Sequence, residues 1–149
     1  MRAILQRVTR GRVSVGGETV GEIGPGLVVL LGVARDDTER DALYLLEKVL
    51  GLRVFDDAEG RMNLSVVERG GGLLVVSQFT LYGDARRGRR PSWSDAAPPE
   101  VAQPLYEFFV TGARRSVPHV ATGSFRSMME VELTNDGPVT ILLDSRKLF

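Results

Sequence analysis

The chain has 149 residues, of which 43% are hydrophobic and 26% charged, and its 19 basic and 19 acidic residues give a formal net charge of zero. This length fits one domain spanning residues 1–149. The charge balance excludes a protein that binds nucleic acid through overall positive charge. The chain contains no cysteine, which excludes disulfides, a thiolate nucleophile and cysteine-ligated metals.

No stretch of the sequence has the pattern of a targeting or membrane segment. The first 15 residues alternate charged and apolar side chains, unlike the apolar core of a signal peptide. No apolar run approaches the roughly 20 residues that a membrane helix needs. We therefore expect a cytoplasmic protein with no membrane partner.

The first third of the sequence favours strands. Residues 3–8 and 12–17 alternate apolar and polar side chains, and residues 19–24 follow a Gly-Gly pair like the return arm of a hairpin. Residues 26–33 are continuously apolar, which is typical of a strand buried on both faces.

The hydrophobic period then changes to that of a helix. Residues 36–51 place their apolar side chains on one face, so this helix is expected to lie on the sheet. Asp36 or Asp37 is expected to cap it, and Gly51 to end it. A short strand is predicted directly afterwards, over residues 52–55.

The middle of the chain returns to strands and then opens into a loop. Residues 62–67 predict a short strand, and residues 73–81 a second central one. Residues 82–99 are rich in glycine, proline and arginine, which predicts a long loop.

The last third predicts one helix and two strands. The helix covers residues 99–115, and Pro104 within it predicts a bend or a late start. Residues 127–145 predict two strands around the turn "NDGP". About eight strands and two helices, with strands too apolar to leave one face in water, predict an α+β fold. We expect two packed β-sheets, barrel-like, with both helices covering one outer face.

The familiar catalytic and cofactor motifs are absent. His119 is the only histidine, and without a Gly-x-Ser-x-Gly segment we interpret it as a surface or strand-end residue. One histidine and no cysteine leave no usual ligand set for a metal, and no glycine-rich phosphate loop follows a strand. We therefore expect neither a metal nor a cofactor.

Two polar segments interrupt otherwise apolar strands. Ser77, Gln78 and Thr80 follow the run Leu-Leu-Val-Val, and the segment "TNDGPVT" contains the pair Gly137-Pro138. The proline removes a backbone donor and so weakens the strand that follows. Taken singly, each segment fits either a functional site or an ordinary strand end.

Together these segments resemble the two signatures of the D-aminoacyl-tRNA deacylases, also called D-tyrosyl-tRNA deacylases. The signatures are Ser-Gln-Phe-Thr-Leu, at residues 77–81, and Asn-x-Gly-Pro-Val-Thr, at residues 135–140. The likeness covers nearly the whole chain, through "LQRVTR", "GEIGPGLVVLLGV", "DAEGRMNLSV", "RGRRPSW" and "TGSF" followed by Met129.

The resemblance implies a homodimeric hydrolase that cleaves the ester between a D-amino acid and the terminal ribose of tRNA, as translation quality control. It also implies that Gly137-Pro138 forms a cis peptide inserted into the partner subunit's active site. There its carbonyls would hold the α-amino group and leave no room for an L side chain. Glycine has no side chain to exclude, so some cleavage of glycyl-tRNA is expected.

The resemblance also implies roles for the first signature. Ser77 and Gln78 are expected to position the substrate, and the backbone amides of Phe79 and Thr80 to face the developing oxyanion. The family's mechanism is thought to use the 2′-hydroxyl of the tRNA itself. A covalent role for the Thr80 hydroxyl remains the alternative, although no base is evident nearby in the sequence.

Two further groups of residues are expected to contact RNA. Phe79, Phe125 and Met129 are expected to line the pocket for the terminal adenosine, because an aromatic ring holds a base by stacking. The acceptor-stem phosphates are expected to meet Arg86, Arg87, Arg89 and Arg90, unless these arginines form only a solvated loop.

The chain departs from the family pattern at Arg126 and Ser127, where the family commonly has smaller residues after Phe125. Bulk at these positions would change the lining of the adenosine pocket. Two other functions stay open at this point. One is a module that binds RNA ends without hydrolysis, which the intact Ser-Gln-Phe-Thr-Leu segment disfavours. The other is a structural dimer with no role in RNA binding.

Overall fold

The computed structural model describes all 149 residues. Its strands are β1 (Arg2–Val15), β2 (Glu18–Ile23), β3 (Gly26–Gly32), β4 (Phe55–Asp56), β5 (Met62–Leu64), β6 (Gly72–Ser77), β7 (Val120–Thr122) and β8 (Glu130–Asp144). Its helices are α1 (Glu39–Gly51), α2 (Val66–Arg69), the short 3-10 helix η1 (Phe79–Tyr82) and α3 (Pro99–Arg114). None of these helices combines the length and the apolar character that a membrane-spanning helix needs.

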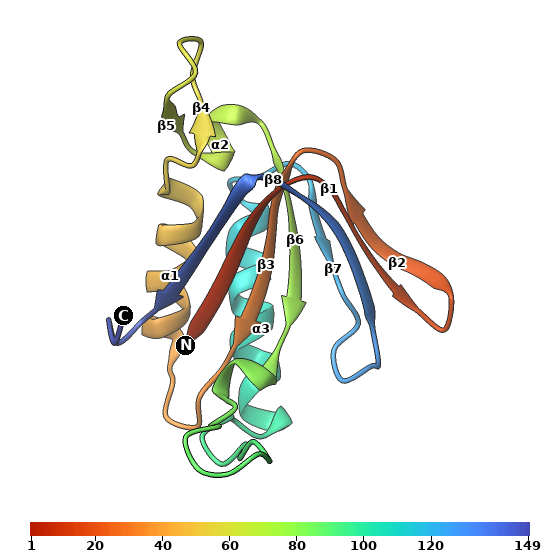
Figure 1. Cartoon of the computed structure of the whole chain (residues 1–149), viewed down its shortest axis with the longest axis vertical. Coiled ribbons are helices and arrows are strands. Elements are labelled where there is room, and N and C mark those ends of the chain that lie inside the picture. Colours follow the sequence, from red (N-terminus) through yellow and green to blue (C-terminus); the bar gives the residue numbers. More distant parts are fainter.

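Six of the strands form one mixed sheet in the order β2-β1-β3-β6-β7, with β8 also paired to β1 (Figure 1). The long strand β1 pairs with β3 along its first half and with β2 along its second, while β8 follows its other edge throughout. The sheet curls until Gly21 of β2 lies against Thr122 of β7. The predicted α+β, barrel-like architecture is confirmed. Its two layers are the curled parts of one sheet, with β4 and β5 as a separate hairpin.

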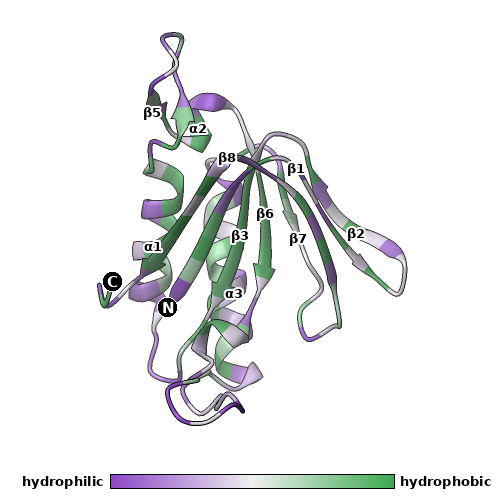
Figure 2. Ribbon diagram, in the orientation of Figure 1, coloured by the Kyte–Doolittle hydropathy of each residue, from purple (hydrophilic) through white to green (hydrophobic).

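Both faces of the sheet are buried, as the apolar strands predicted. On the outer face, α1 and α3 cover β1, β3 and β6, and side chains such as Leu27, Leu73 and Phe109 form the larger core cluster. Inside the curl, a smaller cluster includes Val28 and Leu74. Residues that alternate along β3 and β6 thus enter different clusters, and both strands are almost entirely hydrophobic in Figure 2.

The parallel pair β3–β6 depends on a close approach of two glycines. A Cβ built on Gly26 would lie 2.0 Å from the carbonyl oxygen of Gly72, a distance that no side chain can occupy. Glycine is therefore required where the two strands begin side by side.

The cap predicted for the first helix was wrong. The helix α1 is preceded by Thr38, whose N–H and hydroxyl donate to Asp41 at 2.9 and 3.0 Å, so neither Asp36 nor Asp37 caps it. Its last residue is Gly51, as predicted. The helix α3 begins at Pro99 and runs through Pro104, so of the two predicted alternatives, a bend or a late start, the late start does not occur.

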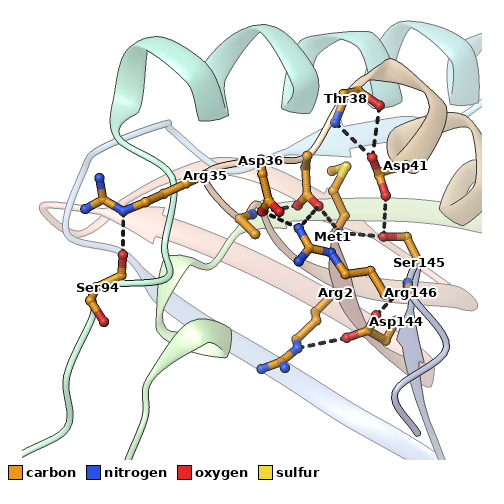
Figure 3. Close-up of polar contacts among 12 residues, drawn as sticks. Met1, Arg2, Arg35, Asp36, Thr38, Asp41, Ser94, Asp144, Ser145 and Arg146 are labelled. Atoms are coloured by element: carbon orange, nitrogen blue, oxygen red, sulfur yellow. Dashed lines mark hydrogen bonds and ion pairs between the residues drawn. The ribbon is translucent and has the colours of Figure 1, made fainter.

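Asp37 belongs instead to a polar network that joins the start of β1, the end of β8 and the segment before α1. Figure 3 shows Met1, Asp36, Ser145 and Arg146 of this network. Its buried carboxylate lies 2.7 Å from the Met1 ammonium and accepts from the N–H of Ala34 at 2.6 Å. Arg146 donates to Asp36, which lowers the pKa of that carboxyl. The Ser145 hydroxyl accepts from the Met1 ammonium at 2.6 Å.

The strand β8 is continuous, although two strands around a turn were predicted. It pairs with β1 on both sides of the Asn-Asp-Gly-Pro segment. The register steps from Gln6↔Thr140 to Val8↔Asn135, so four residues of β8 bulge out opposite Arg7 alone. The bulge bends the strand, and its two arms diverge from the top of the view in Figure 1.

Candidate active site

The first signature lies where β6 ends. Ser77 is the last residue of the strand, and the chain then turns into η1, so the predicted strand over 73–81 stops four residues early. The N–H of Gln78 donates to the carbonyl of Leu31 at 2.8 Å, which fixes the turn to β3. Phe79 and Thr80 occupy the first two positions of η1, so no carbonyl within the helix accepts from their N–H groups.

A cavity of about 650 Å³ opens beside this turn. Its sixteen lining residues are Val76, Ser77, Gln78, Phe79, Thr80, Trp93, Ala96, Ala97, Pro99, Ala102, Phe125, Arg126, Ser127, Met128, Met129 and Val131. The structure thus brings together all six residues predicted for the catalytic segment and the adenosine pocket. It adds Trp93, Met128 and the start of α3, which the sequence analysis did not assign to the site. Trp93 lies within the segment "RGRRPSW", but the sequence of that segment does not predict that the loop folds back to the cavity.

The cavity contains one ionisable side chain, Arg126, and no carboxylate, imidazole or amine. The side-chain amide of Gln78 donates a hydrogen bond to the Thr80 hydroxyl. His119 lies elsewhere, just before β7, where its Nε2 is 2.9 Å from the carbonyl oxygen of Glu22. Its exposed position at a strand end confirms the prediction. The chain therefore places no general base in this cavity.

Phe125 and Met129 each pack on a residue that does not line the cavity. The ring of Phe125 packs on Tyr106 with centroids 5.8 Å apart. The Tyr106 hydroxyl donates to the carbonyl of Val75 at 2.8 Å, and burial raises the pKa of Tyr106 to about 12. The sulfur of Met129 packs against Gly123. These contacts tie the inner wall of the cavity to α3 and β6.

The arginine loop, residues 85–91, follows η1 and leads back to Trp93, which lines the cavity. Asp84 and Ser92 exchange backbone hydrogen bonds of 2.8 and 2.9 Å, which close the loop. Arg86 donates to Asp84 at 2.8 Å through both Nε and Nη2, and this pairing holds the pKa of Asp84 well below its usual range. The other three arginines, Arg87, Arg89 and Arg90, are exposed and form no ion pair.

Gly137 and Pro138 sit in the bulge of β8, joined by a cis peptide bond. The buried guanidinium of Arg7 lies 3.0 Å from the Asp136 carboxylate and donates to the carbonyl of Val54 at 2.8 Å. Asn135 closes the bulge, because its Nδ2 donates to the carbonyls of Arg7 at 2.8 Å and of Val139 at 3.1 Å. Neither residue of the pair lines the cavity of the same chain.

Residues of β1, β2 and β8 line a second hollow, of about 730 Å³. It contains no residue of either signature, and two of its charges, Arg12 and Glu132, pair with each other at 2.5 Å. The cavity beside η1 is therefore the candidate active site.

Comparison with known proteins identifies the family. The family model described as D-Tyr-tRNA(Tyr) deacylase matches residues 4–144. The chain is 64% identical to the D-aminoacyl-tRNA deacylase of Symbiobacterium thermophilum over 149 residues, covering 100% of this chain and 99% of the relative. It is 59% identical to that of Kosmotoga olearia, covering 100% of both chains.

Two solved structures share the fold. The c-Myc DNA Unwinding Element Binding Protein is 40% identical, with a TM-score of 0.92 over 97% of this chain and 98% of that one. A probable eukaryotic D-amino acid tRNA deacylase has a TM-score of 0.83 over 96% of this chain and 98% of that one, and at 20% identity it supports the fold alone. The family model and the full-length relatives show that the chain belongs to the D-aminoacyl-tRNA deacylases, a family of hydrolases.

Proposed function

We propose that the chain hydrolyses the ester that joins a D-amino acid to the terminal ribose of tRNA, releasing free tRNA and the D-amino acid. The observation that carries this function is the cavity itself, which gathers the Ser-Gln-Phe-Thr segment, Phe125 and Met129 around one apolar space. A nucleoside needs such an apolar, partly aromatic wall, and the ester needs the donors of the segment beside it.

The proposed reaction uses few groups of the protein. Water adds to the ester carbonyl, the bond to the ribose oxygen breaks, and a proton passes to that oxygen. The backbone N–H groups of Phe79 and Thr80 stabilise the negative charge that develops on the carbonyl oxygen. Ser77 and Gln78 hold the ester in place. As the resemblance to the family implies, the neighbouring 2′-hydroxyl of the ribose takes part in the proton transfers, and a cavity without a general base agrees with this role.

The chiral filter requires a second copy of the chain. Gly137 and Pro138 do not line the cavity of their own chain, and in the proposed arrangement a partner subunit brings them to it. In the proposed homodimer, their carbonyl groups bind the α-amino group of the substrate. An L side chain would then meet the pair, whereas a D side chain or the hydrogen of glycine would not. We therefore include glycyl-tRNA among the substrates.

The arginine loop is proposed to face the acceptor stem. Arg87, Arg89 and Arg90 are exposed and unpaired, so they are free to bind phosphates. Arg86 would first have to leave Asp84, and its contribution is therefore expected to be smaller.

The direct test compares hydrolysis of D-tyrosyl-tRNA and L-tyrosyl-tRNA by the purified protein. Rapid loss of the D ester with the L ester spared supports both the activity and the filter. Cleavage of both esters at similar rates would contradict the filter. If tRNA binds but neither ester is cleaved, the chain is an RNA-end binding module.

A further inference from the structure

The mouth of the cavity carries large apolar side chains that solvent reaches. Phe79 is 55% exposed, Trp93 42% and Met128 91%. The rings of Phe79 and Trp93 pack edge to face, with centroids 5.4 Å apart. The six-membered ring of Trp93 also packs on Gly83, where an added Cβ would lie 2.5 Å from Cζ3. Both rings are thus held in place while they expose aromatic surface, as a stacking platform requires.

Arg126 lies at the same mouth, on a tight turn. The N–H of Ser127 donates to the carbonyl of Ser124 at 3.2 Å, and the two serine hydroxyls are 2.8 Å apart. Arg126 is the third residue of this turn, with a φ of 64°, where glycine is strongly favoured. Its exposed side chain lines the cavity and forms no ion pair. The turn thus places an unpaired cation at the mouth despite an unfavourable backbone conformation.

The mouth adjoins the arginine loop. Trp93 directly follows Ser92, whose backbone bonds to Asp84 return the loop to the cavity. The segment that carries the unpaired Arg87, Arg89 and Arg90 therefore ends two residues before Trp93, which lines the cavity. Aromatic surface combined with a track of cations is how proteins hold single-stranded nucleic acid.

We propose that this mouth holds the nucleotide that precedes the terminal adenosine of the substrate RNA. Arg126 binds the phosphate that joins the two nucleotides, and Trp93 stacks on the base. The proposal rests on the deacylase function proposed above and extends recognition of the RNA beyond its last nucleoside. An apolar partner would leave the Arg126 cation without a counterion, and an acidic peptide would leave the aromatic pair unused.

The test compares two small esters that differ only in that nucleotide, D-tyrosyl-adenosine and D-tyrosyl-cytidylyl-adenosine. The variants are Arg126→Gly, Trp93→Ala and Trp93→Phe. Glycine suits the backbone at position 126, so Arg126→Gly is expected to fold at least as well as the wild type. The matched control is Arg69→Ala, which removes an exposed, unpaired arginine from α2, before the opposite end of β6.

The wild type is expected to have a higher kcat/KM for the dinucleotide ester than for the adenosine ester. Trp93→Ala should reduce this ratio by about 5- to 140-fold, the range measured for base–aromatic stacking, and Trp93→Phe should restore part of it. Arg126→Gly should reduce the ratio by about fivefold, as for one exposed ionic contact. With full-length D-tyrosyl-tRNA, Arg126→Gly should also reduce the slope of log kcat/KM against log salt by about 0.7.

Three outcomes would overturn the proposal while the deacylase function stands. The first is a wild-type kcat/KM ratio near one, and the second is a ratio that the variants leave unchanged. The third is an equal fall in kcat/KM for both esters, which would place these residues at the adenosine instead. Arg69→Ala should change neither the ratio nor the salt slope by as much as Arg126→Gly. If the wild type cleaves neither small ester nor D-tyrosyl-tRNA, the proposed function itself fails.

Discussion

The ester can be broken in two ways, by attack of the Thr80 hydroxyl or with backbone N–H groups alone, and Thr80→Ala distinguishes them. In the structure this hydroxyl accepts a hydrogen bond from the Gln78 amide, and no base in the cavity can remove its proton. Its loss should therefore cost only what one hydrogen bond contributes to substrate positioning, about 0.5–1.5 kcal/mol. That energy corresponds to a fall of about 2- to 12-fold in kcat/KM.

The assay is single-turnover and steady-state hydrolysis of D-tyrosyl-tRNA by the wild type, Thr80→Ala, Thr80→Val and Thr80→Ser. Thr80 is exposed, so these substitutions should leave the thermal midpoint of unfolding nearly unchanged. The valine variant keeps the shape of the side chain without the hydroxyl. The serine variant keeps a hydroxyl that Gln78 can still reach.

A covalent mechanism makes a different prediction. Removal of a nucleophile lowers the rate by several orders of magnitude. If Thr80→Ala and Thr80→Val both lose about a thousandfold or more while Thr80→Ser stays active, the hydroxyl attacks the ester and the proposed backbone mechanism is refuted. A burst of tRNA release ahead of amino-acid release would support the same conclusion.

Three further substitutions test close contacts in different parts of the fold. Gly26→Ala places a Cβ 2.0 Å from the Gly72 oxygen and should lower the free energy of unfolding, measured in urea, by about 3 kcal/mol. The control Gly24→Ala, whose Cβ would have no atom within 4 Å, should leave that free energy nearly unchanged. Tyr106→Phe should cost about 0.5–1.5 kcal/mol, because the Val75 carbonyl keeps its bond from Gly123; a loss above about 3 kcal/mol would contradict this account. Gly137 has a φ of 113°, and a Cβ added there would lie 3.0 Å from Arg7 Nη2. Gly137→Ala should therefore lower the free energy of unfolding by about 1–3 kcal/mol and slow cleavage of D-tyrosyl-tRNA. An unchanged cleavage rate would contradict the proposed place of this glycine.

The sequence predicted well those elements whose structure depends on residues that are neighbours in the chain. The apolar run over residues 26–33 was recognised as a strand buried on both faces, and the helix over 39–51 from its single apolar face. The site segment was found because Ser77, Gln78 and Thr80 interrupt an apolar run and match a family signature. These features needed no knowledge of distant contacts.

The features that sequence analysis missed depend on distant parts of the chain. The segment around Gly137 looks like a turn until β1 is seen to pair on both sides of it. Asp37 looks like a helix cap until the Met1 ammonium is placed beside it. Trp93 became part of the site because the Asp84–Ser92 bonds return the loop to the cavity. In each case the deciding partner is set by tertiary structure, which overrides local preference.

The pairing of β1 with β8 also has a consequence for how the protein is made. Arg2 bonds to Asp144, 142 positions away, and Arg12 to Glu132, 120 positions away. During synthesis, one edge of β1 must therefore wait until almost the whole chain has left the ribosome. Such non-local pairing folds slowly, and an open strand edge can pair with other chains. A nascent chain stalled before β8 would already contain Ser77 to Thr80 but would still be exposed to aggregation.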